Sequence, residues 1–162
     1  MTKKPFLRRI YHKISEPLND FRFMMENRAL IRTAMRNEIS IKFRERIMLV
    51  VTEVNGCRYC SYFHARMALK AGIPSAELDE FLQGTLPLET SPEEEPALYY
   101  AQHWAETNAN PDAEALQTII NTYGQRKSDA IHIILHMIRM GNLLGNTMDF
   151  WLYKLTFGKF GN

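Results

Sequence analysis

The sequence predicts an all-α protein, a helical bundle of about seven to eight helices. Apolar residues recur at helical spacing along most of the 162 residues, and no segment shows the strict alternation typical of a β-strand. Proline and glycine fall largely between these periodic segments. A chain of this length forms a single domain with a core large enough to need no disulfide scaffold.

Capping residues and helix breakers set the predicted helix boundaries. Ser40 is a suitable cap for a helix that Gly56 ends, and Ser91 followed by Pro92 and two acids is a strong start signal. Ser128 is a suitable cap for the last helix. After a short amphipathic stretch at about 6–14, the predicted helices cover about 15–36, 40–54, 57–71, 74–83, 91–107, 111–124 and 128–144.

We expect three parts: a basic N-terminal helical arm (1–36), a core (37–147) and an aromatic C-terminal tail (148–162). Residues 1–46 hold 12 Lys and Arg against 5 Asp and Glu, whereas residues 47–162 hold 8 against 13. The arginines of the arm are mixed with acids along a predicted helix, which favours a solvated face or a subunit contact. No helix-turn-helix or zinc-finger pattern accompanies them, so we expect no nucleic-acid partner.

The sequence offers no membrane-spanning segment. Its longest aliphatic run, 47–51, is far shorter than the ~20 residues that cross a bilayer, and the N-terminus lacks the apolar region of a signal peptide. We therefore expect a cytoplasmic protein. The aromatic segment 150–157 is compatible with a membrane surface, but burial at a subunit interface of a homo-oligomer is the favoured interpretation.

The two cysteines, Cys57 and Cys60, are spaced for chemistry. A bond between them would close almost no loop and would hardly constrain the unfolded chain. If a helix begins near Cys57, then Cys57, Cys60 and His64 share one face. The helix N-terminus stabilises a thiolate, and His64 lies one turn from Cys60, where it can exchange a proton. These groups suffice for reversible dithiol–disulfide chemistry.

A metal site is the main alternative for these residues. Cys57, Cys60 and His64 offer three ligands, and His132 or His136 would supply the fourth. However, one helical turn seldom wraps a tetrahedral ion, and the chain has no second CxxC. The redox interpretation is therefore favoured over the metal site and over a structural coincidence.

The spacing of these residues resembles a known signature. Glu45, Cys57, Cys60 and His64 match Glu-x11-Cys-x2-Cys-x3-His, the pattern of the AhpD-like alkylhydroperoxidases within the carboxymuconolactone decarboxylase superfamily. The flanking segments 44–46, 55–57 and 71–74 agree as well. Beyond about residue 85 the resemblance is mainly one of helix order, and the first 35 or so residues match no family that we recognise.

The resemblance implies an oligomeric helical fold and thiol-dependent reduction of hydroperoxides. It assigns Cys60 as the peroxidatic thiol and Cys57 as the resolving one, with Glu45 and His64 as a proton relay through water. The reductant would be an external dithiol on a thioredoxin-like or lipoyl protein, with no bound cofactor or metal. The helix dipole alone favours Cys57 as the more acidic thiol by ~0.3–1 kcal/mol. A relay base acts directly on one sulfur, so we follow the family in assigning Cys60.

One position departs from the pattern. Some members carry a histidine directly before the second cysteine, where this chain has Tyr59. A phenol is no base near neutral pH, so we expect weaker peroxidase activity. The superfamily's decarboxylases lack the cysteine pair, which argues against lactone decarboxylation. A non-catalytic redox sensor or structural oligomer is the alternative function.

Further residues have mainly structural interpretations. Glu53 is a fallback acid at a helix end that we expect to be exposed, and His103 is expected in the core with Trp104 at the surface. The remaining residues lie on the last predicted helix: His132 and His136 are expected in the core, Gly141 and Gly145 at a close helix contact, and Asn142 and Asn146 on one face where lining a substrate pocket is the less favoured option.

Overall fold

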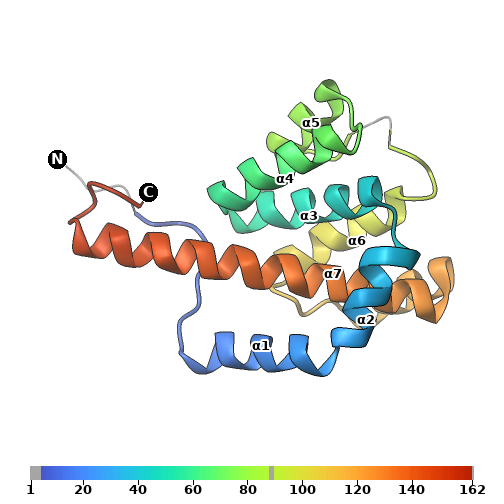
Figure 1. Cartoon of the computed structure of the whole chain (residues 1–162), viewed down its shortest axis with the longest axis horizontal. Coiled ribbons are helices and arrows are strands. Elements are labelled where there is room, and N and C mark those ends of the chain that lie inside the picture. The colour runs from blue at the N-terminus through green and yellow to red at the C-terminus, as the bar shows by residue number, and fades with distance from the viewer. Residues whose placement is uncertain (1–4, 88–89, 162) are drawn as a thin grey trace.

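The all-α prediction is confirmed by a computed structural model, which describes residues 5–87 and 90–161. Within these ranges the chain forms seven α-helices and one π-helical segment, and no strand (Figure 1). Residues 1–4 of the predicted basic arm, and residues 88–89 of the predicted loop, lie outside the described residues.

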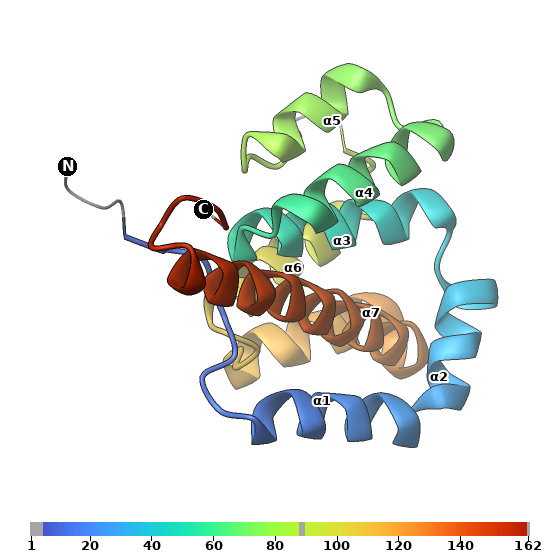
Figure 2. The same ribbon diagram turned by 60° about the vertical axis from the view of Figure 1, so that its left-hand side comes forward.

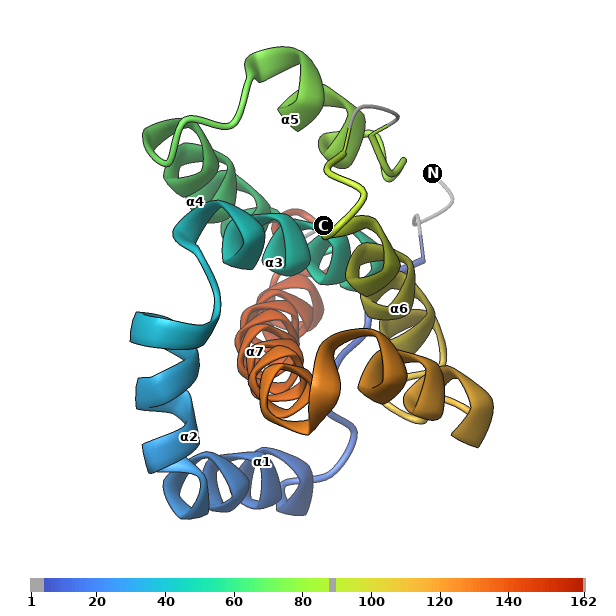
Figure 3. The same cartoon turned by 90° about the vertical axis from the view of Figure 1, so that its right-hand side faces the viewer.

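The long helix α7 (Ala113–Leu155) is the axis of the molecule. Seen along this axis, α3 (Ile41–Asn55) and α6 (Glu95–Glu106) lie on one side, and α1 (Ser15–Glu26) lies on the opposite side (Figure 3). In the view of Figure 2, α4 (Arg58–Lys70) and α5 (Ser75–Leu82) are stacked outside α3. The most extensive contacts of α3 are therefore with α7, α6 and α4.

Helix α3 forms as its sequence predicts. The side chain of Ser40 accepts a hydrogen bond from the backbone N–H of Phe43 at 3.1 Å, and Gly56 ends the helix with a φ of 72°. The aliphatic run 47–51 is buried on all sides, as a helix without a polar face must be. Arg46 reaches Glu77 of α5 at 2.6 Å and Glu94 at 2.8 Å, which fixes α3 against the neighbouring layer.

The N-terminal region differs from the prediction in two places. The stretch 6–14 is extended rather than helical, because its polar groups bond to α7: the backbone N–H of Tyr11 donates to Thr147 at 3.0 Å. The predicted helix 15–36 breaks at Asn27, whose side chain and backbone N–H both donate to the carbonyl oxygen of Phe23, at 2.9 and 3.1 Å, a shared acceptor that bends helices. The pieces are α1, α2 (Arg28–Thr33) and the π-helical η1 (Ala34–Glu38).

The C-terminal region is more continuous than predicted. Helix α6 begins at Glu95, since the carbonyl oxygen of Ser91 first closes a turn with the N–H groups of Glu94 and Glu95. The two predicted helices from Pro111 onwards form one element, α7, joined across a kink at Gly124. This helix continues to Leu155 and so runs through the expected boundary between the core and the tail at residues 147 and 148. Ser128 is no cap: its buried hydroxyl donates to the carbonyl oxygen of Ile119 across the kink at 3.0 Å.

The burial of two neighbouring residues on α6, His103 and Trp104, is the reverse of the prediction. Trp104 is 2% exposed, whereas His103 is partly exposed and lies 3.1 Å from Asp112. Their helix turns the indole toward α7, where its ring meets that of His136 with centroids 5.0 Å apart. Burial of the large apolar surface of an indole is more favourable than burial of an imidazole. This difference determines which face of α6 is turned toward α7.

The two histidines of α7 are partly exposed at the edge of the core rather than fully inside it. His132 bonds to the carbonyl oxygen of Ser128 at 2.9 Å and to the hydroxyl of Tyr100 at 2.6 Å. His136 packs against the rings of Phe23 and Trp104, and burial lowers its pKa to about 4. Both rings therefore have protein partners.

None of the described helices is long and apolar enough to cross a membrane.

The kink at Gly124 gives a first prediction. Gly124 has φ 74° and ψ 161°, a conformation that strains any other residue, and a Cβ there would meet no described atom within 4 Å. Gly124→Ala should therefore lower the free energy of unfolding by ~1–3 kcal/mol through backbone strain alone. Denaturant unfolding measures this change.

Gly141 provides the matched control. It lies in the regular part of α7, and a Cβ there also meets nothing within 4 Å. Gly141→Ala should raise the free energy of unfolding by ~0.5–1 kcal/mol through helix propensity. If both substitutions changed the free energy of unfolding equally, the strained backbone conformation at Gly124 would be contradicted.

Candidate functional site

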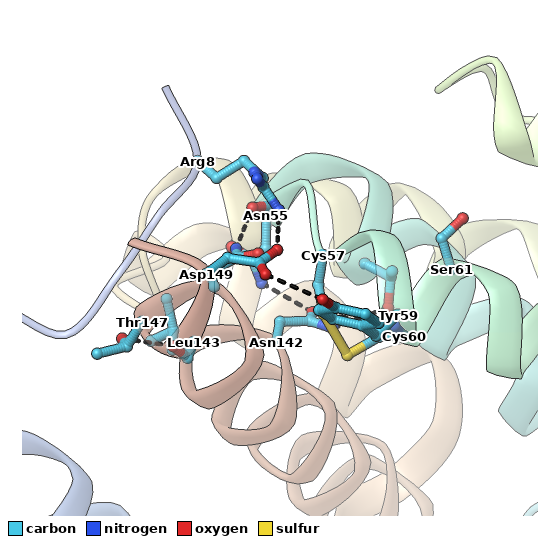
Figure 4. Close-up of a disulfide and its surroundings, with 12 residues drawn as sticks. Arg8, Asn55, Cys57, Tyr59, Cys60, Ser61, Asn142, Leu143, Thr147 and Asp149 are labelled. Carbon is cyan, nitrogen blue, oxygen red and sulfur yellow. Dashed lines mark hydrogen bonds and ion pairs between the residues drawn. A yellow bond between two sulfur atoms is a disulfide. The ribbon is translucent and has the colours of Figure 1, made fainter. Parts of the chain in front are cut away.

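The turn between α3 and α4 positions the two cysteines. Cys57 is the N-cap of α4, directly after Gly56, and its sulfur accepts a hydrogen bond from the backbone N–H of Cys60 at 3.4 Å. The two residues form a disulfide with their Cα atoms 5.3 Å apart (Figure 4). The structure is therefore that of the oxidised protein, and the two cysteines lie at the positive end of the α4 helix dipole.

Glu45 and His64 form a buried pair between α3 and α4. The Nδ1 atom of His64 lies 2.7 Å from Oε2 of Glu45, and both side chains are nearly buried. Glu45 lies in the second turn of α3, and its other carboxylate oxygen lies 3.4 Å from the Nε atom of Arg44. Because Glu45 fixes Nδ1, the Nε2 atom of His64 is the ring nitrogen left for proton exchange.

The two cysteines differ in exposure. Cys57 is 1% exposed, whereas Cys60 is partly exposed. Helix α7 covers Cys57: a Cβ on Gly145 would lie only 3.1 Å from the Cys57 sulfur. Gly145 therefore marks a close contact, as predicted, but that contact is with a sulfur atom, and Gly141 makes no such approach.

Asn142 and Asn146 are fully buried and belong to a hydrogen-bond network. Asn142 donates to the hydroxyl of Thr52 at 3.1 Å and accepts from the side chain of Asn55 at 3.1 Å. Asn146 donates to the carbonyl oxygens of Asn55 and Arg9 at 2.8 and 2.9 Å. The network joins the last turn of α3 to α7 directly beneath Cys57.

Glu53 is half-buried rather than exposed, and its partners differ from those of the Glu45–His64 pair. Its carboxylate accepts a hydrogen bond from the hydroxyl of Ser61 at 2.7 Å and lines a cavity of about 160 Å³ with Phe81 and Gln102. Burial raises the pKa of Glu53, and the hydrogen bond from Ser61 partly offsets that rise. We therefore retain Glu45, the residue of the signature, as the candidate relay acid.

The described residues contain no group of three or more His, Cys, Asp or Glu side chains arranged to hold a metal ion. In particular, His132 and His136 bond to or pack against other core residues, as described above.

The comparison with protein families agrees with this arrangement. The model of the carboxymuconolactone decarboxylase family matches residues 21–103, just over half of the chain. The chain belongs to this family. No curated protein and no solved structure matches it. The family match begins inside α1, so our expectation that the first 35 or so residues have no family counterpart is wrong for residues 21–35. It ends in α6 and includes Glu45, Cys57, Cys60 and His64.

One part of the site lies beyond the family match and was not predicted. Asp149 of α7 is buried beside the disulfide, where its carboxylate accepts from the hydroxyl of Tyr59 at 3.1 Å (Figure 4). It also accepts from Arg58 at 3.0 Å, so it contacts both residues between the cysteines. The available signal was the helical spacing of 142, 146 and 149, which places an acid on the face of the two asparagines. The hydroxyl of Tyr59, the residue that departs from the family pattern, is thus engaged by a carboxylate.

The contact between Gly145 and Cys57 gives a second prediction. Gly145→Ala and Gly141→Ala gain the same helix propensity, but only the former places a methyl group against a buried sulfur. Overpacking should make the oxidised Gly145→Ala protein less stable than Gly141→Ala by ~1 kcal/mol or more. Urea unfolding of both oxidised variants measures this difference, and equal stabilities would contradict the contact.

Proposed function

We propose that the protein is a thiol-dependent peroxidase, with peroxiredoxin-type antioxidant activity, that reduces hydroperoxides through Cys57 and Cys60. The observation that carries this proposal is the buried pair of Glu45 and His64, whose ring nitrogen and carboxylate lie 2.7 Å apart on the face of α4 that bears the cysteines. A histidine fixed by a carboxylate is suited to accept and return a proton. The family membership supports the same proposal.

The proposed cycle balances in three steps. The Cys60 thiolate attacks the peroxide ROOH, which with one proton yields Cys60 sulfenic acid and ROH. The Cys57 thiol condenses with the sulfenic acid, which forms the disulfide and releases water. An external dithiol then reduces the disulfide by exchange and leaves as a disulfide itself. His64 takes the proton from Cys60 and returns it to the departing oxygen, and Glu45 stabilises the charged ring.

The exposures of the two sulfurs support Cys60 as the attacking thiol. Cys57 lies under α7 at 1% exposure, so a peroxide reaches Cys60 more readily. The position of Cys57 at the helix N-terminus favours its thiolate, which suits a resolving thiol and a leaving group in the exchange with the reductant.

The cycle needs a cellular compartment and an electron donor. We propose a cytoplasmic protein with a thioredoxin-like or lipoyl reductant and no bound cofactor, since the dithiol itself carries the electrons. The alternative, a non-catalytic redox sensor, predicts reversible disulfide formation without turnover under any reductant. A Cys/His metal module predicts stoichiometric zinc in the purified protein, and metal analysis tests it.

Peroxide consumption tests the proposed cycle. With an organic hydroperoxide and dithiothreitol, Cys60→Ser should reduce consumption to background. Without dithiothreitol, which itself reduces a sulfenic acid, Cys57→Ser should consume one peroxide per protein and stop at the sulfenic acid. Glu45→Gln should lower the rate by ~10²-fold, the usual scale of lost acid–base catalysis. The measurement is the loss of peroxide with time, and trapping of the sulfenic acid by dimedone identifies the attacking sulfur.

Glu53→Gln is the matched control. It changes the other acid of α3, a half-buried residue in the second half of the helix that is bonded to Ser61, and should leave the rate within twofold of the wild type. Unchanged peroxide consumption by Cys60→Ser would overturn the proposal.

We also propose that the protein is a homo-oligomer that buries the exposed apolar face of α7. Met148, Trp151 and Leu155 are 73%, 60% and 75% exposed on this face, beside a groove of about 670 Å³ that also includes Tyr59. The opposite face of the same segment is covered, since the ring of Phe150 packs on Phe6 at 5.5 Å. Large exposed apolar patches mark interaction sites.

Light scattering tests this assembly. The wild type should elute as more than one copy, and Trp151→Glu should shift it toward the monomer because a charge cannot be buried there without a partner. Phe21→Glu, at an equally exposed aromatic residue of α1, should leave the mass unchanged. A monomeric wild type would contradict the proposal.

A further inference from the structure

A buried carboxylate beside the dithiol joins three segments that are far apart in the sequence. The side chain of Asp149 is 3% exposed. Its Oδ2 atom lies 2.5 Å from Nη1 of Arg8, and its Oδ1 atom accepts from Arg58 and from the hydroxyl of Tyr59 (Figure 4). The second terminal nitrogen of Arg8 donates to the carbonyl oxygen of Gly161, so the N-terminal segment and the end of the chain meet at this carboxylate.

Two of these partners are the residues between the cysteines. Arg58 and Tyr59 form the first turn of α4, which begins after Cys57 and carries Cys60 in the same turn. A carboxylate that holds both side chains therefore fixes the part of the backbone on which the distance between the sulfurs depends. Asp149 belongs to α7, which also covers Cys57 through Gly145, so both contacts come from one rigid element.

Asp149 faces two cationic side chains. Two guanidinium groups, those of Arg8 and Arg58, face one carboxylate, and the side chain of Arg8 is mostly buried. The hydrogen bond from Arg58 to Asp149 raises the pKa of the arginine, which stays charged. On the α3 side of α4, Glu45 is paired with His64, and Glu53 accepts a hydrogen bond from Ser61.

We propose that Asp149 is a positioning residue that sets the redox balance of the Cys57–Cys60 pair. It holds Arg58 and Tyr59 in the turn that brings the sulfurs together, and its charge offsets those of Arg8 and Arg58. The proposal rests on the redox activity of the pair in the proposed function, but it does not depend on peroxide as the oxidant.

The direction of the effect follows from the charge of the reduced form. Two glutathione molecules reduce the disulfide to two thiols and leave as one glutathione disulfide, and loss of a proton then gives a thiolate. The guanidinium groups stabilise this thiolate and Asp149 opposes it. Removal of the carboxylate charge therefore favours the dithiol, whereas removal of a guanidinium charge favours the disulfide.

A merely structural role would give a different pattern. Asp149→Asn and Arg8→Gln break the same ion pair and loosen the same contact, so loosening alone would move the redox equilibrium in one common direction. Opposite shifts identify the electrostatic role.

The test uses the full-length protein in glutathione redox buffers at pH 8, where alkylation and mass spectrometry count the free thiols. Asp149→Asn should shift the equilibrium toward the dithiol about three- to tenfold, and Arg8→Gln should shift it toward the disulfide by a similar factor. The alkylation rate of reduced Cys60 by iodoacetamide should rise in the former and fall in the latter. Arg22→Gln, which removes an exposed arginine of α1, should change neither quantity.

Shifts of Asp149→Asn and Arg8→Gln in the same direction, or no shift beyond the scatter of the control, would overturn the proposal. If Asp149→Asn does not fold, Arg58→Gln and Arg58→Lys take its place, because Arg58 is 45% exposed and tolerates substitution better. Both loosen the contact, but only Arg58→Gln removes the charge, so it must shift the equilibrium toward the disulfide and Arg58→Lys must not; any other result overturns the proposal. Neither readout uses peroxide, so a failure here and a failure of the proposed peroxidase activity remain distinguishable.

Discussion

The position of the dithiol depends on the buried hydrogen bonds that join the last turn of α3 to α7. Thr52 and Asn55 of α3 meet Asn142 and Asn146 of α7 in a region without water access. Each amide left without its partner would cost ~1–3 kcal/mol, so the network fixes one relative placement of the two helices. The turn that follows α3 is thereby fixed as well, and it delivers Cys57 against α7.

The same helix α3 supplies the acid of the candidate site. Glu45 lies ten residues before the end of α3, on a helix that is buried on nearly all sides and therefore cannot rotate. Because α4 folds back along α3, His64 reaches Glu45 although 19 residues separate them. A carboxylate this deeply buried needs such a partner, since an unpaired buried charge is strongly unfavourable. Stability and the proposed proton relay thus require the same contact.

The dithiol lies between two buried carboxylates with different partners. Glu45 faces His64 on the α3 side, where a proton can be exchanged. Asp149 faces Arg8 and Arg58 on the α7 side, where the charges are permanent at neutral pH. The first arrangement is suited to moving a proton and the second to a fixed electrostatic influence. The N-terminal segment, extended along α7, completes the second arrangement and so belongs to the surroundings of the site.

The sequence by itself determined the helical class, the limits of α3 and α4, and the four candidate residues with their spacing. Caps, periodicity and the CxxC spacing act within a few residues of each other, so they can be read from the chain directly. The tertiary structure alone decided the extended path of residues 6–14, the break at Asn27 and the continuity of α7 to Leu155. It also decided that Cys57 is the covered sulfur and that Asp149 lies beside it. Arg8 and Asp149 are 141 residues apart, and no local pattern can specify a contact that exists only once α7 is packed against α3.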